Sequence, residues 1–465
     1  MELCFGNKPL TGSMNPLSTL EIQIAERART HKDEPLKTLH PFIDGELLNQ
    51  CFTELNKRGA AGIDDQSWHD YNENRSERIT KLLTAFNEGS YRAPAIRRVY
   101  IPKGKGKRRP LGLPTVEDKL LQTAVTKILT PIYEQEFYDC SYGFRPGKSQ
   151  HQALDELFKQ VSFSSIRYVI DADMADYFGS INHQQLREFL DRRIKDGVIR
   201  KMIDKWLKAG VLEEGRITYP DKGTPQGGSI SPILSNIYLH HALDEWFIEQ
   251  IQPLLKGRST LIRFADDFLL GFTNKEDARR VMKVLSKRLE RYNLTLHSEK
   301  TKLICLNSNH ETEKADTFDF LGFTHYMSRS RKGWPVLKCK TSSKKMTASL
   351  QRLHLWLKVN QHKPVNELIE IINQKLRGHY NYYGIPFNSR SLHSYYEQVK
   401  RKLHWFLNRR GGRQKWNWER YVMLINNWNP LVRPKIYHRR ILANPHTEEP
   451  DAENPLVRIC GGGGR

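Results

Sequence analysis

The chain has 465 residues, 38% of them hydrophobic, which excludes a disordered protein and predicts a globular one with two or three domains. Its 74 Lys and Arg outnumber 52 Asp and Glu, and the net charge of +22 indicates a polyanionic partner. No apolar run is long enough to cross a membrane, no signal peptide is recognisable, and the six dispersed cysteines are expected to be free thiols of a cytosolic protein.

The first third of the chain contains one strongly basic segment. Residues 1–44 are polar and are expected to form a partly ordered extension. From residue 45 helical periodicity alternates with strands, and "RRVYIPKGKGKRRPLGLP" (97–114) is typical of a β-hairpin with glycines and lysines at its tip. Its seven basic residues between Arg97 and Arg109 fit either a phosphate-binding surface or a solvated run of charge.

Acidic residues alternate with apolar ones in "RYVIDADMADYF" (167–178). The start of this segment is predicted to be a strand with Asp171 and Asp173 on one face and apolar side chains on the other. We therefore expect one buried face and one charged face. Asp171 and Asp176 are interpreted as structural neighbours of Asp173.

A helix is predicted after "GTPQGGS" (223–229), with Ser231 as its N-cap and Pro232 as its first residue. The glycine-rich segment lacks the GK[ST] sequence of a P-loop. His240 and His241 are expected on the surface of this helix rather than in a metal site, because no Cys or acidic pattern accompanies them.

Two adjacent carboxylates lie at the expected turn of a hairpin in "RFADDFLLGF" (263–272). Asp266 and Asp267 repel each other unless a divalent cation binds there, and the alternative is an ordinary β-turn that uses Asp for local hydrogen bonds. A polymerase needs carboxylates from at least two strands. Asp173 supplies the third acid if its strand and this hairpin are neighbours in one antiparallel sheet.

The region from Thr341 to Arg440 holds 20 basic and 4 acidic residues and five of the nine tryptophans. Basic and aromatic residues interleaved on helices suit RNA, whose bases stack on rings and whose phosphates attract cations. Helices with aromatic cores explain the tryptophans equally well but not the excess of charge.

Several segments, taken in order, resemble the successive motifs of a reverse transcriptase. They are "ADMADYFGSI" (172–181), "GTPQGGSISPILSNIYL" (223–239), "RFADDFLLGF" (263–272), "LHSEKTKL" (296–303) and "FDFLGF" (318–323). Segments 60–65, 100–125 and 141–154 upstream, and 376–385 and 403–421 downstream, are similar to the bacterial group II intron-encoded reverse transcriptases and maturases. The resemblance runs from about residue 45 to about residue 440.

This resemblance implies an α/β (α+β) right-hand polymerase. Residues 1–44 would be an N-terminal extension, 45–335 fingers and palm with an antiparallel sheet, 336–440 a helical thumb or maturase (X) domain, and 441–465 a flexible tail. The chain shows no Cys/His cluster of the endonuclease region that many relatives carry. We therefore expect an enzyme without that domain, which takes its primer from another source such as a replication fork.

The resemblance also implies a set of site residues. Asp173 and Asp266 would be the principal ligands of two Mg²⁺ ions, with Mn²⁺ as a substitute, and Asp267 a weaker ligand. The nucleotide-binding residues would be Lys103, Arg109, Phe178 as a steric gate against ribose, Gln226, Gly227 and Lys300 near the pyrophosphate. Phe264 stands where the family usually has Tyr, and activity is expected to survive this exchange. The RNA-binding residues would be Arg97, Arg98, Lys105, Lys107, Arg108, Arg409, Arg410 and Arg413.

The implied function is RNA-directed DNA synthesis together with help in splicing and mobilising the parent intron. The implied partners are intron RNA, an RNA template with a DNA primer, deoxynucleoside triphosphates and a DNA target site, in the bacterial cytosol. Two alternatives stay open: a polymerase domesticated for phage defence or DNA repair, and a splicing-only maturase. The presence of all three acids weighs against the second.

Overall fold

The computed structural model describes residues 19–32, 34–104, 107–213, 215–224, 227–306, 316–330, 332–410 and 416–438. The described residues form two compact units: a larger one within residues 19–153 and 168–303, and a smaller one within residues 154–167 and 304–438. Helix α6 (Gln150–Ser162) and strand β10 (Lys302–Cys305) run from one unit into the other. None of the helices in the described ranges combines the length and apolar character that a bilayer crossing requires. The four cysteines in these ranges form no disulfide, as expected.

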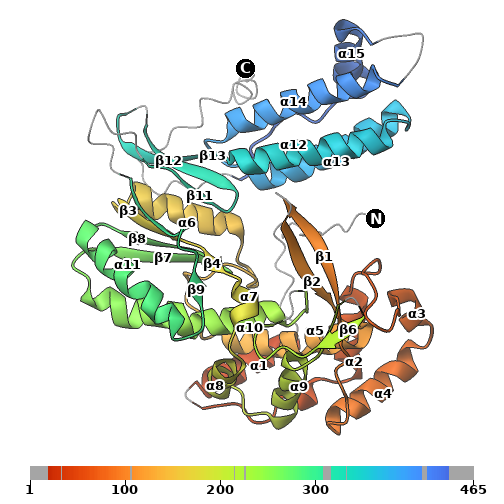
Figure 1. Cartoon of the computed structure of the whole chain (residues 1–465), viewed down its shortest axis with the longest axis vertical. Helices are drawn as coiled ribbons and strands as arrows, with labels where there is room; N and C mark the ends of the chain where they lie inside the picture. The colour runs from red at the N-terminus through yellow and green to blue at the C-terminus, as the bar shows by residue number, and fades with distance from the viewer. Residues whose placement is uncertain are drawn as a thin grey trace, which may run out of the picture. The chain divides into compact units, whose positions relative to one another are not determined.

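The larger unit mixes helices and short sheets, which confirms the expected α/β class (Figure 1). Its helices are α1 (Thr19–Thr30), η1 (His40–Phe42), α2 (Gly45–Glu54), α3 (Trp68–Glu73), α4 (Arg75–Asn87), α5 (Val116–Tyr133), α7 (Tyr177–Ser180), α8 (His183–Asp191), α9 (Gly197–Leu207), α10 (Ser231–Leu239), η2 (His240–Asp244), η3 (Trp246–Ile251), η4 (Gln252–Leu254) and α11 (Lys275–Glu290). Its strands are β1 (Ile96–Gly104), β2 (Lys107–Leu113), β3 (Tyr168–Ala172), β4 (Met174–Ala175), β5 (Val211–Glu213), β6 (Arg216–Thr218), β7 (Ser259–Phe264), β8 (Asp267–Phe272) and β9 (Thr295–Leu296).

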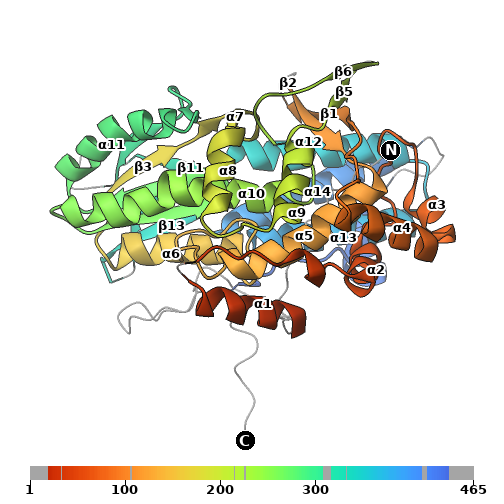
Figure 2. The same cartoon turned by 90° about the horizontal axis from the view of Figure 1, so that it is seen from below.

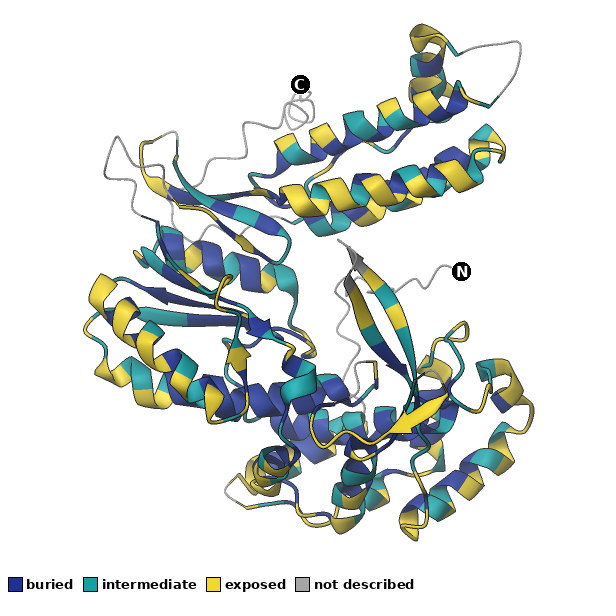
Figure 3. Ribbon diagram, in the orientation of Figure 1, coloured by how far each residue is buried: buried dark blue, intermediate teal, exposed yellow. Residues whose placement is uncertain are grey.

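The predicted basic hairpin is present as β1 and β2. They pair antiparallel from Arg97 opposite Leu113 to Gly104 opposite Lys107, and the tip residues 105 and 106 lie outside the described residues. β1 also pairs in parallel with β5, so the sheet β2-β1-β5-β6 is mixed rather than purely antiparallel. All residues of β6 are exposed, which makes β6 the open edge of this sheet (Figure 3).

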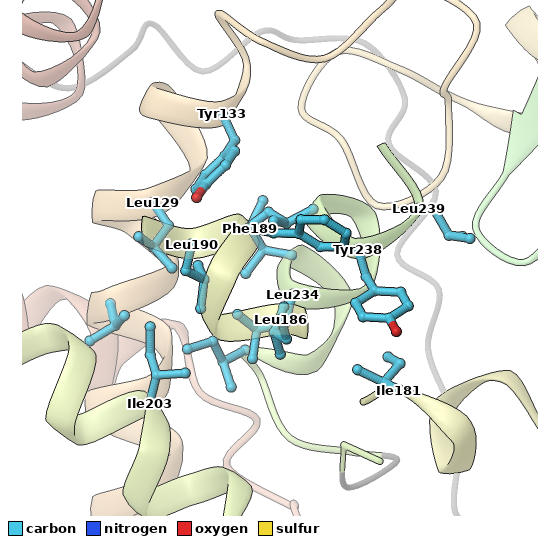
Figure 4. Close-up of a cluster of buried hydrophobic side chains, with 14 of the residues drawn as sticks. Leu129, Tyr133, Ile181, Leu186, Phe189, Leu190, Ile203, Leu234, Tyr238 and Leu239 are labelled. Atoms are coloured by element: carbon cyan, nitrogen blue, oxygen red, sulfur yellow. The ribbon is translucent and has the colours of Figure 1, made fainter. Parts of the chain in front are cut away.

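An apolar core lies among α5, α8, α9 and α10, and α5 and α8 both contact α10 (Figure 2). Leu186, Phe189 and Leu190 of α8 recur at spacings of three and four residues, so they share one buried face of the helix. These side chains lie near Tyr238 of α10 in Figure 4. This apolar core therefore holds α10 in place.

Strands β3, β8 and β7 form neighbouring strands of one antiparallel sheet. β3 pairs with β8 from Tyr168 opposite Phe272 to Ala172 opposite Phe268, and β7 joins β8 through the predicted hairpin. The expectation of one buried and one charged face is only partly right, because Val169 and Ile170 are both buried. The sheet is thus covered on both faces along the first half of β3.

Two expectations about α10 are wrong. Ser231 is the first helical residue rather than the N-cap, Ile230 holds the N-cap position without a side-chain cap, and Pro232 is the second helical residue rather than the first. His240 and His241 are 5% and 6% exposed rather than on the surface, because α10 continues through the π-helical turns of η2 and aromatic rings from the α5 and α8 segments cover both histidines. Burial lowers the pKa of His240 to about 3.

The smaller unit consists of an antiparallel sheet followed by helices. Its strands are β11 (Phe318–Phe320), β12 (Phe323–Arg329) and β13 (Pro335–Thr341), and its helices are α12 (Ser343–Asn360), α13 (Val365–Tyr383), α14 (Ser389–Leu407), α15 (Trp418–Met423) and η5 (Leu424–Trp428). Buried Asn388 accepts from the Thr341 amide at 2.7 Å and donates to the Tyr383 carbonyl at 2.8 Å. The His379 and Tyr395 rings stack with centroids 3.7 Å apart. These contacts join α13 and α14 to the end of β13.

Candidate active site

The register of β3 on β8 brings the three predicted acids to one edge of the sheet. The last pair of this ladder is Ala172 opposite Phe268. The next residues outward on the two strands are Asp173 and Asp267, and Asp266 precedes Asp267 in the turn. Opposed residues of neighbouring antiparallel strands have Cα atoms roughly 4.5–5.5 Å apart. Acids that are distant along the chain are therefore neighbours in space.

Lys300 lies beside the same edge. β4, which directly follows Asp173, pairs with β9, and the His297 amide donates to the Asp173 carbonyl at 2.8 Å. The turn after β9 places Lys300 next to Asp173, and the Lys300 ammonium forms an ion pair with the Asp173 carboxylate. The structure thus places the predicted lysine in direct contact with one predicted acid.

The donor chemistry of this edge suits a hard divalent cation, which prefers carboxylate oxygens. The Asp173 carboxylate already takes a cation, the Lys300 ammonium. Among the described residues, no three His, Cys, Asp or Glu side chains converge closely enough to hold an ion as they stand. A metal ion bound by the Asp173 carboxylate would therefore compete with the Lys300 ammonium for it.

Phe178 lies on the short helix α7, which follows Asp176 in a left-handed conformation (φ 42°). Two contacts that do not involve the ring hold the backbone of Phe178. The Thr224 amide donates to the Phe178 carbonyl at 2.8 Å, and a Cβ on Gly223 would lie 2.9 Å from that carbonyl oxygen. A Cβ on Gly179 would lie 2.3 Å from the Asp176 carboxylate, so a larger residue there would displace that side chain.

A cavity of about 200 Å³ adjoins this loop. Its walls come from β1, β2 and β5 on one side and from the Asp176–Gly179 and Pro220–Thr224 segments on the other. Arg98 and Lys222 add positive charge to its lining and Asp176 adds one acid. The cavity is lined by Gly179, which follows Phe178, and by Thr224, whose amide binds the Phe178 carbonyl, so it is a candidate pocket for a nucleotide next to this residue.

The structure describes only some of the predicted nucleotide-binding residues in full. Gln226 lies outside the described residues, and Lys103 is described only in its backbone. Arg109 is exposed on β2. Gly227 has φ +115°, and a Cβ there would lie 2.5 Å from the Gly112 carbonyl oxygen, so the glycine lets this loop pack against β2.

Two arginines of the basic hairpin already form ion pairs with acids of this protein. Arg97 forms an ion pair with Asp65 at 2.7 Å, and Arg98 forms one with Glu213 at 3.1 Å. Arg108 is exposed, Lys107 is described only in its backbone, and Lys105 lies outside the described residues. Two of the seven basic residues of this hairpin are therefore already paired with acids.

In the smaller unit, Arg409 is exposed and its guanidinium lies 4.3 Å from the ring centroid of Trp405, which is 44% exposed. Burial lowers the pKa of Arg410. Arg413 lies outside the described residues. An exposed cation stacked on an exposed ring is the arrangement that binds phosphates and unpaired bases.

Sequence reasoning missed the ion pair below the acidic turn. Arg263 and Asp244 are both fully buried, with Nη2 and Oδ2 2.6 Å apart. Burial lowers the pKa of the Arg263 guanidinium, but the Asp244 carboxylate more than offsets this effect, so the pKa lies above its ordinary value. An arginine inside the apolar strand "STLIRF" was the available signal, because a buried charge needs a partner.

The same family emerges from comparison with known proteins. Residues 101–325 match the family "Reverse transcriptase (RNA-dependent DNA polymerase)" and residues 345–422 match "Group II intron, maturase-specific domain". The group II intron-encoded protein LtrA of Lactococcus lactis subsp. cremoris is 29% identical over 82% of this chain and 76% of its own. Protein YkfC of Escherichia coli is 32% identical over 57% of this chain and 78% of its own. A telomerase reverse transcriptase of Takifugu rubripes is 26% identical over 39% of this chain and 17% of its own.

The fold and these matches define the class as that of the RNA-directed DNA polymerases, a class that uses divalent metal ions. Within this class, the chain belongs to the group II intron reverse transcriptase and maturase family.

Proposed function

We propose that this protein copies RNA into DNA at the sheet edge where Asp173, Asp266 and Asp267 meet. The observation that supports the proposal is the register of β3 on β8, whose last pair is Ala172, the residue before Asp173, opposite Phe268, the residue after Asp267. Asp173 and Asp266 are the principal ligands of two Mg²⁺ ions, for which Mn²⁺ can substitute, and Asp267 is a weaker ligand. Two ions held by these carboxylates would supply a lower pKa for the primer 3′-hydroxyl and positive charge opposite the triphosphate.

The incoming deoxynucleotide binds beside Phe178, whose ring takes the space of a ribose 2′-hydroxyl. Support comes from the cavity of about 200 Å³ that is lined by Asp176 and Gly179, the residues on either side of the Tyr177–Phe178 pair. Lys300 protonates the leaving pyrophosphate after the Lys300 ammonium has left its ion pair with Asp173. The remaining nucleotide-binding residues are Lys103, Arg109, Gln226 and Gly227.

The protein also binds its parent intron RNA, helps it to splice and carries it to a DNA target. The match of residues 345–422 to the maturase-specific domain and the similarity to LtrA support this role. We assign 45–335 to fingers and palm and 336–440 to the thumb, and we place the protein in the bacterial cytosol. The RNA-binding residues are Arg97, Arg98, Lys105, Lys107, Arg108, Arg409, Arg410 and Arg413.

Primer extension tests the polymerase proposal directly. Purified protein is given an RNA template, an annealed DNA primer and the four deoxynucleotides, with Mg²⁺, with Mn²⁺ or with a chelator. We expect full-length DNA with Mg²⁺, a product with Mn²⁺ and none with the chelator. Folded, RNA-bound protein that extends no primer with either metal would refute the proposal.

Arg409→Gln is expected to weaken RNA binding, because it removes an exposed cation from the Trp405 ring. The slope of log K against log[salt] should become shallower by about one unit for one lost phosphate contact. Arg280→Gln, the same change of charge at an exposed position of α11, is the matched control. Equal salt slopes for both variants and the wild type would place the RNA elsewhere.

A further inference from the structure

The turn that carries Asp266 and Asp267 has an unfavourable backbone. Phe264 pairs with Asp267, so Ala265 and Asp266 form a two-residue turn. Ala265 has φ +58°, a left-handed conformation that such turns usually assign to glycine. A non-glycine residue keeps this conformation only where its surroundings hold it there.

The buried Arg263 side chain supplies one such restraint. Its Nε donates to Asp244 Oδ1 at 2.8 Å and its Nη2 donates to Asp244 Oδ2 at 2.6 Å. Its Nη1 donates to Asn236 Oδ1 at 3.0 Å and to the Ala265 carbonyl at 3.2 Å. One guanidinium therefore connects η2 and α10 to the left-handed residue of the turn.

The segment before α6 supplies a second restraint on the same turn. The Arg263 amide donates to the Cys140 carbonyl and the Tyr142 amide donates to the Arg263 carbonyl, both at 2.8 Å. Asn236 Nδ2 donates to the Gly143 carbonyl at 2.7 Å. A Cβ on Gly143 would lie 2.3 Å from the Ala265 nitrogen, so this segment packs directly against the turn.

We propose that Arg263 is a positioning residue for the polymerase reaction: with its charge balanced by Asp244, it holds the Ala265 carbonyl and so fixes the direction of the Asp266 and Asp267 carboxylates. This inference rests on the proposed function. A pair kept only for stability would have no need of the bond to Ala265, since apolar residues of similar volume often replace a buried ion pair without loss of stability.

The test removes both charges together in Arg263→Met/Asp244→Leu. We expect a folded protein that binds RNA as the wild type does and keeps its KM for deoxynucleotides. Its kcat should fall and its dissociation constant for Mn²⁺, measured by electron paramagnetic resonance, should rise, each by roughly 10- to 100-fold, as is typical when a residue that orients a metal ligand is lost. Amide hydrogen exchange of residues 264–268 should become faster.

Two further variants keep the test decisive. Arg193→Met/Glu136→Leu removes another ion pair of the larger unit, between buried Arg193 and partly exposed Glu136 with atoms 3.0 Å apart, and should leave Mn²⁺ affinity unchanged. Arg263→Lys keeps the charge opposite Asp244 but cannot also reach Ala265, so it should retain stability better than Mn²⁺ affinity if the double variant does not fold.

The outcomes separate the two proposals. A wild-type protein that extends no primer refutes the proposed function. An active wild type whose Arg263→Met/Asp244→Leu or Arg263→Lys variant keeps wild-type kcat, Mn²⁺ affinity and exchange at 264–268 refutes the positioning role of Arg263.

Discussion

Replacing Asp266 and Asp267 together by Ala is expected to abolish primer extension on an RNA template. Losing the carboxylates at the turn removes several kcal/mol of charge stabilisation. Because each 1.36 kcal/mol is tenfold in rate, the rate of primer extension should fall on the order of 1,000-fold or more. RNA affinity should stay near the wild-type value, because neither carboxylate is cationic. Single-turnover extension and RNA filter binding, measured on the same preparations, check both parts.

The matched control for this variant is Glu188→Ala/Asp191→Ala. It removes two exposed carboxylates from α8 of the same unit, so it changes the net charge equally. We expect wild-type extension from the control. Unchanged extension by the Asp266/Asp267 variant would remove the metal-site assignment, and simultaneous loss of RNA binding and of the unfolding transition would indicate damage to the fold.

Local patterns in the sequence were sufficient to predict the two hairpins. Gly and Lys at the tip of β1–β2 and the short polar turn of β7–β8 each interrupt a strand pattern, and short-range geometry decides such features. The position of Asp173 relative to Asp267, unlike the two hairpins, is not decided by short-range geometry. It depends on the pairing of β3 with β8, which strand periodicity alone does not specify, and was expected only as one possible arrangement.

Burial was predicted less well than secondary structure. His240 and His241 follow α10 with no sequence signal of burial, and only the packing of α5 and α8 segments covers them. The Arg263–Asp244 pair was missed for the same reason, since the partner of a buried charge is set by tertiary structure. The packing of Gly227 against the Gly112 carbonyl of β2 was not expected either, and the predicted approach of Gly227 to a nucleotide stays a prediction.

Phe178→Ala is expected to reduce the preference for deoxynucleotides over ribonucleotides. Opening the space of one ring next to the sugar should lower the ratio of kcat/KM for a deoxynucleotide to that for the matching ribonucleotide by roughly 10- to 200-fold, the range for discrimination by shape alone. Competing incorporation opposite one template base measures this ratio. Phe178→Tyr keeps the ring and should keep the ratio.

The Phe178 ring packs against Tyr177 and the apolar core, and these contacts are lost in Phe178→Ala, but two contacts of the backbone remain. The Phe178 backbone is fixed through its carbonyl by the Thr224 amide at 2.8 Å and by the close approach of Gly223. Both contacts survive the loss of the ring, so α7 should stay in place and Asp173 should keep its position five residues upstream. Incorporation of deoxynucleotides by Phe178→Ala should therefore remain within a few-fold of wild type while ribonucleotide incorporation rises. An unchanged ratio in an active variant would show that another side chain reads the sugar.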